Sequence, residues 1–254
     1  MIQAIDNNFN QHANKIINQT DGMTVYETEN LTYSDSNLSC DTFNIIHITN
    51  GLNLNQIELE KAINYFRQKQ LEYCIWINEI NLNSVKSMFH DLKLKNHNKE
   101  VGMVMDMKQY DPISKAGHSN IKIVEDRNQL NDFATVIAEN WEPTDTNVLK
   151  YYSKTAHAYL AETTSIILLI YYQNEIPVSV VELFPSNHQI IGLYGFATKK
   201  EFRRAGIGNA MFTYALNLIK EKGYTHAILQ ASEDGIGIYR KYGFEERTVY
   251  YEYA

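Results

Sequence analysis

The sequence predicts a mixed α/β fold, in which a central sheet has helices on both faces and a smaller α/β domain comes first. Strand-like apolar runs alternate with amphipathic helical patterns along the chain. A glycine-rich turn at Arg203–Ala210 joins the strand-like run 190–198 to a helical pattern. Segment 109–118, with Pro112, Gly117 and no hydrophobic period, has the composition of a linker. We therefore predict an N-terminal domain at 1–108, a linker at 109–118 and a second domain at 119–254.

The elements of the second domain can be placed in order along the chain. A short strand at 121–124 precedes Asp126 and Gln129, whose spacing matches a helix cap. We expect that helix to end at Pro143. The helix after the glycine turn repeats apolar residues at i, i+3, i+4 and i+7, and Gly223 follows its last turn. The remaining predicted elements are a helix at about 145–162 and strands at 165–172, 176–184, 190–198, 224–231 and 249–253.

Composition excludes several classes of partner. The 254 residues carry a formal net charge of -7, which argues against a general nucleic-acid or anionic-membrane surface. The longest apolar run, 166–172, is too short to cross a bilayer. Two cysteines and a start without a basic, apolar leader favour a reducing, cytoplasmic setting. The histidines and cysteines show no ligand spacing, so no metal site is expected.

The glycine turn has the chemistry of a phosphate site. Glycines let the backbone approach a ligand closely and adopt unusual dihedral angles. The N–H groups at a helix start, together with the positive end of the helix dipole, attract an anion. Short Gly-x-Gly strings also form ordinary turns, so the string by itself is a weak signal.

Two motifs together carry a family resemblance. Segment 198–209, Thr-Lys-Lys-Glu-Phe-Arg-Arg-Ala-Gly-Ile-Gly-Asn, is followed at 238–244 by Ile-Tyr-Arg-Lys-Tyr-Gly-Phe. From about Ser119 to Ala254 the chain resembles the GCN5-related N-acetyltransferase (GNAT) family, in its acetyl-CoA pyrophosphate loop and its last helix. The resemblance implies a sheet of the GNAT type and acetyl-CoA as co-substrate. Another kind of phosphate-binding domain explains the glycines but not the Tyr-x-x-x-Gly-Phe ending.

The resemblance also implies which residues bind the co-substrate. Backbone N–H groups of the turn would hold the pyrophosphate, and its two arginines would add charge unless they are merely solvated. The end of the preceding strand would pair with the pantetheine arm, and one of its N–H groups would polarise the thioester carbonyl. Phe196 can alternatively be core packing. The implied residues are Phe196, Ala197, Thr198, Arg203, Arg204, Ala205, Gly206, Ile207, Gly208 and Asn209.

Tyr239 is the predicted catalytic residue. In the family, the tyrosine of this ending gives a proton to the departing thiolate, which a phenol with a pKa near 10 can do. With 18 tyrosines in the chain, a packing role is the alternative. Ser232 stands where many family members have a cofactor-binding asparagine, and it can bind the cofactor or cap a helix.

The general base is not identified by the motifs. Some family members carry a glutamate where this chain has Gly192. Tyr194 and Glu182 are the remaining candidates, and each can instead be structural. A water chain would remove the need for a dedicated base. The segment 140–142, between the first two helices of the domain, is where family members place the acceptor.

The N-terminal part repeats the order strand, helix, strand, helix, strand. The predicted elements are 43–49, 54–70, 72–77, 84–94 and 100–107, and we interpret them as a degenerate second copy of half the GNAT fold. Aligning the last helices places Phe89 on Tyr239 and Leu94 on Phe244. Since Phe89 has no proton to donate and 51–56 lacks paired glycines, this copy should not bind CoA. A coincidental βαβαβ order is the alternative.

The predicted function is acetyl transfer from acetyl-CoA to a primary amine of a small molecule, amino acid or peptide, by direct attack in a ternary complex. The alternative is a non-catalytic acetyl-CoA-binding sensor or interaction protein. The identity of the acceptor and the oligomeric state do not follow from the sequence.

Overall fold

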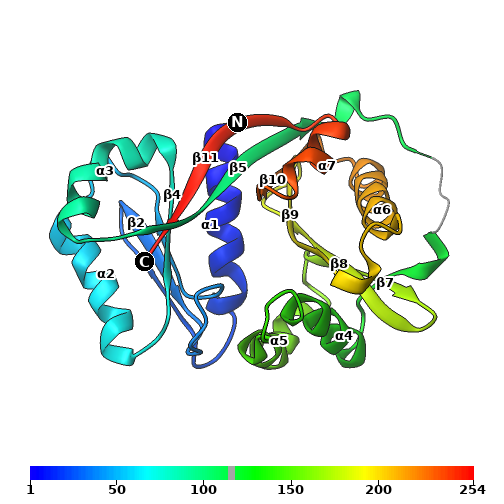
Figure 1. Ribbon diagram of the computed structural model, residues 1–254, viewed down its shortest axis with the longest axis horizontal. Coiled ribbons are helices and arrows are strands. Elements are labelled where there is room, and N and C mark those ends of the chain that lie inside the picture. The colour runs from blue at the N-terminus through cyan, green and yellow to red at the C-terminus, as the bar shows by residue number, and fades with distance from the viewer. Residues whose placement is uncertain (114–117) are drawn as a thin grey trace. The chain divides into compact units, whose positions relative to one another are not determined.

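The computed structural model describes residues 1–113 and 118–254 (Figure 1). Residues 114–117 of the predicted linker lie outside this description. By its internal contacts the chain forms two compact units, unit 1 with Met1–Met103 and Gln230–Ala254, and unit 2 with Val104–Leu229. The units depart from the predicted limits 1–108, 109–118 and 119–254 because the C-terminal strand pairs within unit 1. The compact units do not test where domains begin and end in the sequence, so the limits predicted from the sequence stay a prediction.

Unit 1 has a mixed sheet in the strand order β1-β2-β3-β4-β11-β5. Strands β3 and β4 are parallel, whereas the pairs β1–β2, β2–β3 and β4–β11 are antiparallel. Its elements are α1 (Ile2–Asn18), β1 (Thr24–Glu27), β2 (Leu31–Asp35), β3 (Ile45–Ile48), α2 (Gln56–Lys69), β4 (Cys74–Asn78), α3 (Glu79–Asp91), most of β5 (Asn96–Asp106), α7 (Ile236–Lys241) and β11 (Glu245–Tyr253).

Alternation along β4 explains how unit 1 covers both faces of its sheet. Ile75 and Ile77 join the apolar core formed with α2 and α3. Trp76 points the other way and stacks on Phe9 of α1, with ring centroids 4.6 Å apart. Helix α1 therefore lies on the face opposite α2 and α3 (Figure 1).

Unit 2 has the strand order β10-β9-β8-β7-β6, with β9 and β10 parallel. Strands β5 and β10 each run from one unit into the other. Its elements are the end of β5, η1 (Met107–Gln109), η2 (His118–Asn120), β6 (Ile121–Ile123), α4 (Arg127–Ala138), α5 (Thr146–Tyr159), β7 (Ile167–Gln173), β8 (Ile176–Pro185), β9 (Ile190–Thr198), η3 (Lys200–Phe202), α6 (Ile207–Glu221) and β10 (His226–Ala231).

Most predicted elements of unit 2 are present with small shifts. The predicted cap of α4 is confirmed, since the Asp126 carboxylate accepts hydrogen bonds from the N–H groups of Asn128 and Gln129. The predicted end of that helix at Pro143 is wrong, because α4 stops at Ala138 and a turn follows. The mixed sheet with helices on both faces is confirmed. At β9, Ile137 of α4 approaches Gly195, while Phe196 meets Phe212 of α6.

The predicted repeat of element order agrees with the structure. The series β3-α2-β4-α3-β5 matches β9-α6-β10-α7-β11, and the first two strands are parallel in both. The two last helices also end alike. The Leu94 N–H donates to the Phe89 carbonyl at 3.0 Å, and the Phe244 N–H donates to the Tyr239 carbonyl at 3.1 Å. The descent of the N-terminal copy from a GNAT half stays a prediction.

Among the described helices, none is both long enough and apolar enough to cross a membrane.

Candidate functional site

The turn between β9 and α6 has the backbone geometry of an anion site. Gly206 precedes the helix with φ 82°, and Arg204 also has a positive φ of 62°. No side chain caps α6, and intrahelical bonding begins with the Ala210 N–H, which donates to the Gly206 carbonyl at 3.0 Å. Residues 203–206 are exposed. The predicted turn therefore presents the positive end of α6 to solvent.

The two arginines of the turn differ in their contacts. The Arg203 guanidinium donates to the Thr198 carbonyl at 2.8 Å and to Asn140 Oδ1 at 3.0 Å. It therefore ties the turn to the end of β9 and to the segment after α4. The Arg204 side chain makes no hydrogen bond or ion pair with any residue that the structure describes. Arg204 is the arginine whose charge remains available to a ligand.

Strand β9 changes its pairing where the pantetheine arm was predicted to bind. Its pairing with β10 covers only Ile190–Gly192, although both strands continue. On its other side the register with β8 shifts between Tyr194 and Ala197, and Gly195 within this bulge has φ 56°. The predicted residues Phe196, Ala197 and Thr198 thus lie beyond the β10 pairing, where an added chain can bond to the strand.

Side chains around this end of β9 hold it in place. Ser179 Oγ donates to the Ala197 carbonyl at 2.7 Å and lies 2.9 Å from Thr198 Oγ1. The Phe196 ring packs on Phe212 of α6, with centroids 5.5 Å apart. The Phe196 ring therefore packs on α6, and its role in ligand binding stays a prediction. The other predicted turn residues are the exposed Ala205 and Asn209, the half-buried Gly208 and the buried Ile207.

Ser232 and Tyr239 lie together at the start of α7. The Ser232 carbonyl accepts the N–H groups of Gly235 and Ile236, and its hydroxyl accepts the Gly235 N–H at 3.3 Å. This contact supports the capping interpretation of Ser232. Tyr239 is 9% exposed, and its phenol lies 3.6 Å from where a Cβ on Gly235 would stand. Burial, followed by the charge of Glu100, raises the pKa of Tyr239 above its usual value, so the phenol keeps its proton at neutral pH.

The predicted site residues therefore fall into two groups. The turn and residues 196–198 belong to unit 2, whereas Ser232 and Tyr239 belong to unit 1. Each group is assembled within its own unit.

The two candidates for a general base share one face of the sheet. Glu182 of β8 is directly opposite Tyr194 of β9. Glu182 is 3% exposed, and the buried phenols of Tyr152 and Tyr159 have a pKa raised by burial and then by this carboxylate. Gly192 is buried and brings no acidic group to β9. In the predicted acceptor segment, the Asn140 amide donates to the Val136 carbonyl, while Trp141 and Glu142 are exposed.

The interaction of Glu100 with Glu252 and with Tyr239 was not predicted. Glu100 of β5 is half-buried, and burial together with the nearby Glu252 raises its pKa to about 8. Its charge is in turn the second cause of the raised pKa of Tyr239. The sequence shows Glu100 only as the start of a strand, since its neighbours Tyr239 and Glu252 are more than a hundred residues away along the chain.

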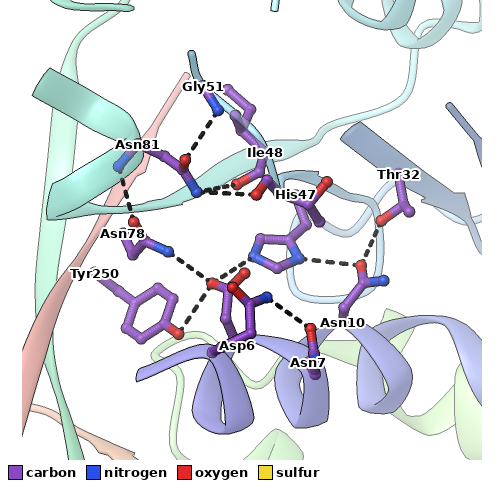
Figure 2. Close-up of polar contacts among 12 residues, drawn as sticks. Asp6, Asn7, Asn10, Thr32, His47, Ile48, Gly51, Asn78, Asn81 and Tyr250 are labelled. Atoms are coloured by element: carbon purple, nitrogen blue, oxygen red, sulfur yellow. Dashed lines mark hydrogen bonds and ion pairs between the residues drawn. The ribbon is translucent and has the colours of Figure 1, made fainter. Parts of the chain in front are cut away.

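The corresponding loop of the N-terminal copy is closed by hydrogen bonds within the chain (Figure 2). Asn81 accepts the Gly51 N–H at 2.9 Å and donates to the carbonyls of Ile48 and Thr49. Strands β3 and β4 stay paired through Ile48 and Ile77. A Cβ on Gly51 would stand 2.3 Å from the Asn81 carbonyl oxygen, so no space is left there. That this copy does not bind CoA stays a prediction.

Within the described ranges, no group of three or more histidine, cysteine, aspartate or glutamate side chains is placed to hold a metal ion.

A family model for the acetyltransferase (GNAT) domain matches residues 135–252. This part of the chain is a GNAT domain. The match runs continuously through both the glycine turn and Tyr239.

Solved GNAT structures share the fold of the chain. A GCN5-related N-acetyltransferase from Kribbella flavida matches with a TM-score of 0.71 and 14% identity, over 98% of this chain and 94% of that one. One from Sphaerobacter thermophilus matches with a TM-score of 0.61 and 11% identity, over 94% and 84%. A tandem GNAT protein from the clavulanic acid biosynthesis pathway matches with a TM-score of 0.56 and 8% identity, over 92% and 83%. A search of curated proteins found no match.

Proposed function

We propose that the protein is an N-acetyltransferase that moves the acetyl group of acetyl-CoA to a primary amine of a small molecule, amino acid or peptide. The GNAT domain at 135–252 supports acetyl transfer as the class of reaction. The observation that carries the proposal is the exposed, uncapped start of α6, with Arg204 and Gly206 in left-handed conformations before it. Such a turn suits a diphosphate, the charged group that CoA contributes.

The binding roles follow from the local geometry. N–H groups of Ala205–Asn209 would bind the diphosphate, and Arg204 would add its unengaged charge. The backbone of 196–198, beyond the β10 pairing, would bond to the amides of the pantetheine arm. Arg203 would position the turn through its contacts with Thr198 and Asn140.

In the chemical step, the neutral amine attacks the thioester carbonyl carbon. The tetrahedral intermediate then loses the nitrogen proton to water and expels the CoA thiolate, which takes a proton from Tyr239. A proton from water restores the phenol, so the products are the amide and CoA thiol. Because Tyr239 is buried and has a raised pKa, it is protonated at neutral pH and can serve as this acid.

Thiol release from acetyl-CoA across a panel of amines tests the function. We expect turnover with at least one amine, and a loss of about 100-fold or more in kcat for Tyr239→Phe. Acetyl-CoA affinity, measured by calorimetry, should stay within about twofold, because the phenol acts on the sulfur and not on the diphosphate. Tyr242→Phe, a half-buried tyrosine just after the same helix, is the matched control and should retain turnover.

The second candidate is a non-catalytic acetyl-CoA-binding sensor. The specific observation in its favour is Gly192, which leaves β9 without the carboxylate of some family members. Acetyl-CoA binding without thiol release for any amine would support the sensor and contradict the enzyme.

A further inference from the structure

Two polar contacts join the C-terminal end of α4, residues 137–140, to the connection between β9 and α6. Glu139 Oε2 lies 2.9 Å from Lys199 Nζ. Asn140 Oδ1 accepts a hydrogen bond from the Arg203 guanidinium at 3.0 Å, across 63 residues of the chain. All four residues belong to unit 2. The end of α4 is therefore fastened to the stretch that carries the glycine turn.

The ion pair of Lys199 with Glu139 is better protected from water than its neighbour. The Lys199 side chain is 10% exposed. The side chains of Lys200 and Glu142, which lie 4.0 Å apart, are 84% and 94% exposed. Solvated pairs contribute little, because water and salt screen the charges and both side chains lose freedom. Of the two ion pairs, the one at Lys199 therefore carries the link.

Asn140 is held in the orientation that suits Arg203. Its amide nitrogen donates to the Val136 carbonyl at 2.8 Å, and its backbone N–H donates to the Ile137 carbonyl at 3.1 Å. Turning the amide over would set its NH2 group against the guanidinium, which has only donors. The Asn140 side chain is therefore a fixed acceptor that the end of α4 presents to the turn.

The end of α4 also touches both places where the backbone of the proposed acetyl-CoA site is left-handed. In the bulge of β9, a Cβ on Gly195 would lie 3.2 Å from Ile137 Cδ1. In the turn, Asn140 fixes Arg203, which directly precedes the left-handed Arg204. A residue other than glycine keeps such a conformation only where its surroundings over-determine it.

We propose that the end of α4 supports the acetyl-CoA site, and that Asn140 is a positioning residue that acts through Arg203 on the turn. This role rests on the proposed function, in which the turn holds the diphosphate. Asn140 would then strengthen acetyl-CoA binding without a contact to the ligand. Because coupling between two places in a protein is reciprocal, bound acetyl-CoA should in turn stabilise the end of α4.

Calorimetry of acetyl-CoA binding tests the role of Asn140. Asn140→Ala should weaken the affinity about fivefold, which corresponds to the loss of one ordinary hydrogen bond. The matched control is Asn131→Ala, which changes an exposed asparagine of the same helix and should bind acetyl-CoA as wild type does. An unchanged affinity in Asn140→Ala would overturn the proposal.

A double-mutant cycle separates positioning through Arg203 from a general loss of stability. In an Arg203→Ala background, Asn140→Ala should change the acetyl-CoA affinity less than about twofold, because its partner is already gone. A general destabilisation would act in both backgrounds. Additive losses in the double variant would therefore contradict the proposed route through Arg203.

Hydrogen exchange of the wild-type protein gives an independent readout that needs no variant. The N–H groups of Glu139, Asn140 and Trp141 all donate within the end of α4. Saturating acetyl-CoA should slow their exchange about fivefold, the same factor as the change in affinity. The Leu130 N–H, in the first turn of the helix, should exchange at an unchanged rate.

The outcomes of the exchange experiment distinguish the two proposals. Equal exchange rates at 139–141 with and without bound acetyl-CoA would overturn the role of Asn140 and leave the proposed function in place. Wild-type protein that binds no acetyl-CoA would instead overturn the proposed function, and the role of Asn140 with it.

Discussion

Two residues of the turn before α6 have left-handed backbones, and the free-energy cost of this conformation differs between them. Gly206, with φ 82°, has no Cβ and adopts this conformation freely. Arg204, with φ 62°, is strained by about 1–2 kcal/mol. Strain of this kind is kept where the surrounding structure or a ligand requires it. The conformation of Arg204 therefore supports a binding role for the turn.

The two ends of α6 offer a matched pair of glycine substitutions. Gly206 and Gly223 have φ values of 82° and 83°, and a Cβ on either would meet nothing within 4 Å. Alanine at either position should therefore lower stability by a similar amount, about 1–2 kcal/mol. Only Gly206→Ala should weaken acetyl-CoA binding, by about tenfold or 1.4 kcal/mol. Urea unfolding and calorimetry measure the two effects. Equal acetyl-CoA affinities for both variants would contradict the assignment of the turn.

At the scale of elements, a buried polar cluster joins α1 to three strands of unit 1 (Figure 2). Asp6 Oδ1 lies 3.2 Å from His47 Nε2 of β3, and accepts from Asn78 Nδ2 of β4 and the Tyr250 hydroxyl of β11. Burial opposes ionisation of Asp6. The charge of His47 and the hydrogen bonds of the cluster outweigh it and hold the pKa below 3.8.

Asp6→Asn should destabilise the protein by about 2 kcal/mol, because an amide replaces the buried carboxylate that contacts His47 and accepts from Asn78 and Tyr250. The free energy of unfolding in urea at pH 7 measures this loss. Asp21→Asn is the control, since Asp21 is exposed after α1, and its effect should stay within about 0.5 kcal/mol. Equal unfolding midpoints for Asp6→Asn and wild type would show that the cluster adds no stability.

The loss of stability in Asp6→Asn should depend on pH. A carboxyl with a depressed folded-state pKa contributes stability above its unfolded value of 3.8, and this contribution is lost as pH falls through the folded pKa. The difference between wild type and Asp6→Asn should therefore be full above about pH 5 and shrink below pH 3.8. Unfolding curves from pH 3 to 7 measure it. A difference that grows toward low pH would contradict the ionised state of Asp6.

At the scale of the whole molecule, the compact units are interleaved along the chain. Unit 1 needs residues 230–254, which follow all of unit 2. Strand β11 pairs with β4 from Tyr250–Tyr253 to Ile75–Asn78, so the end of the chain completes the N-terminal sheet. The sequence domains and the folding units are therefore different divisions of the chain.

A fragment spanning 119–254 should not fold alone, although it holds the whole resemblance to the family. It would expose the side of β11 that pairs with β4 and would lack all of β5. We expect no cooperative thermal unfolding by circular dichroism for this fragment. Co-expression with residues 1–118 should restore a soluble complex with a cooperative transition. A cooperative transition in the fragment alone would contradict this dependence.

The sequence by itself determined the elements whose signals are local. The cap at Asp126, the turn at Gly206 and the helix after it were predicted because spacing and glycine chemistry act within a few residues. Helix α1 was missed because its apolar residues Ile5, Phe9 and Ile16 are diluted by asparagine and glutamine.

Only the tertiary structure decided which distant groups share an environment. The pairing of β11 with β4, the cluster around Asp6 and the effect of Glu100 on Tyr239 join segments that are far apart along the chain. Burial and neighbouring charges set the ionisation of such groups, and both arise only when remote segments pack together. The motif residues were therefore visible in the sequence, whereas the influence of Glu100 on Tyr239 was not.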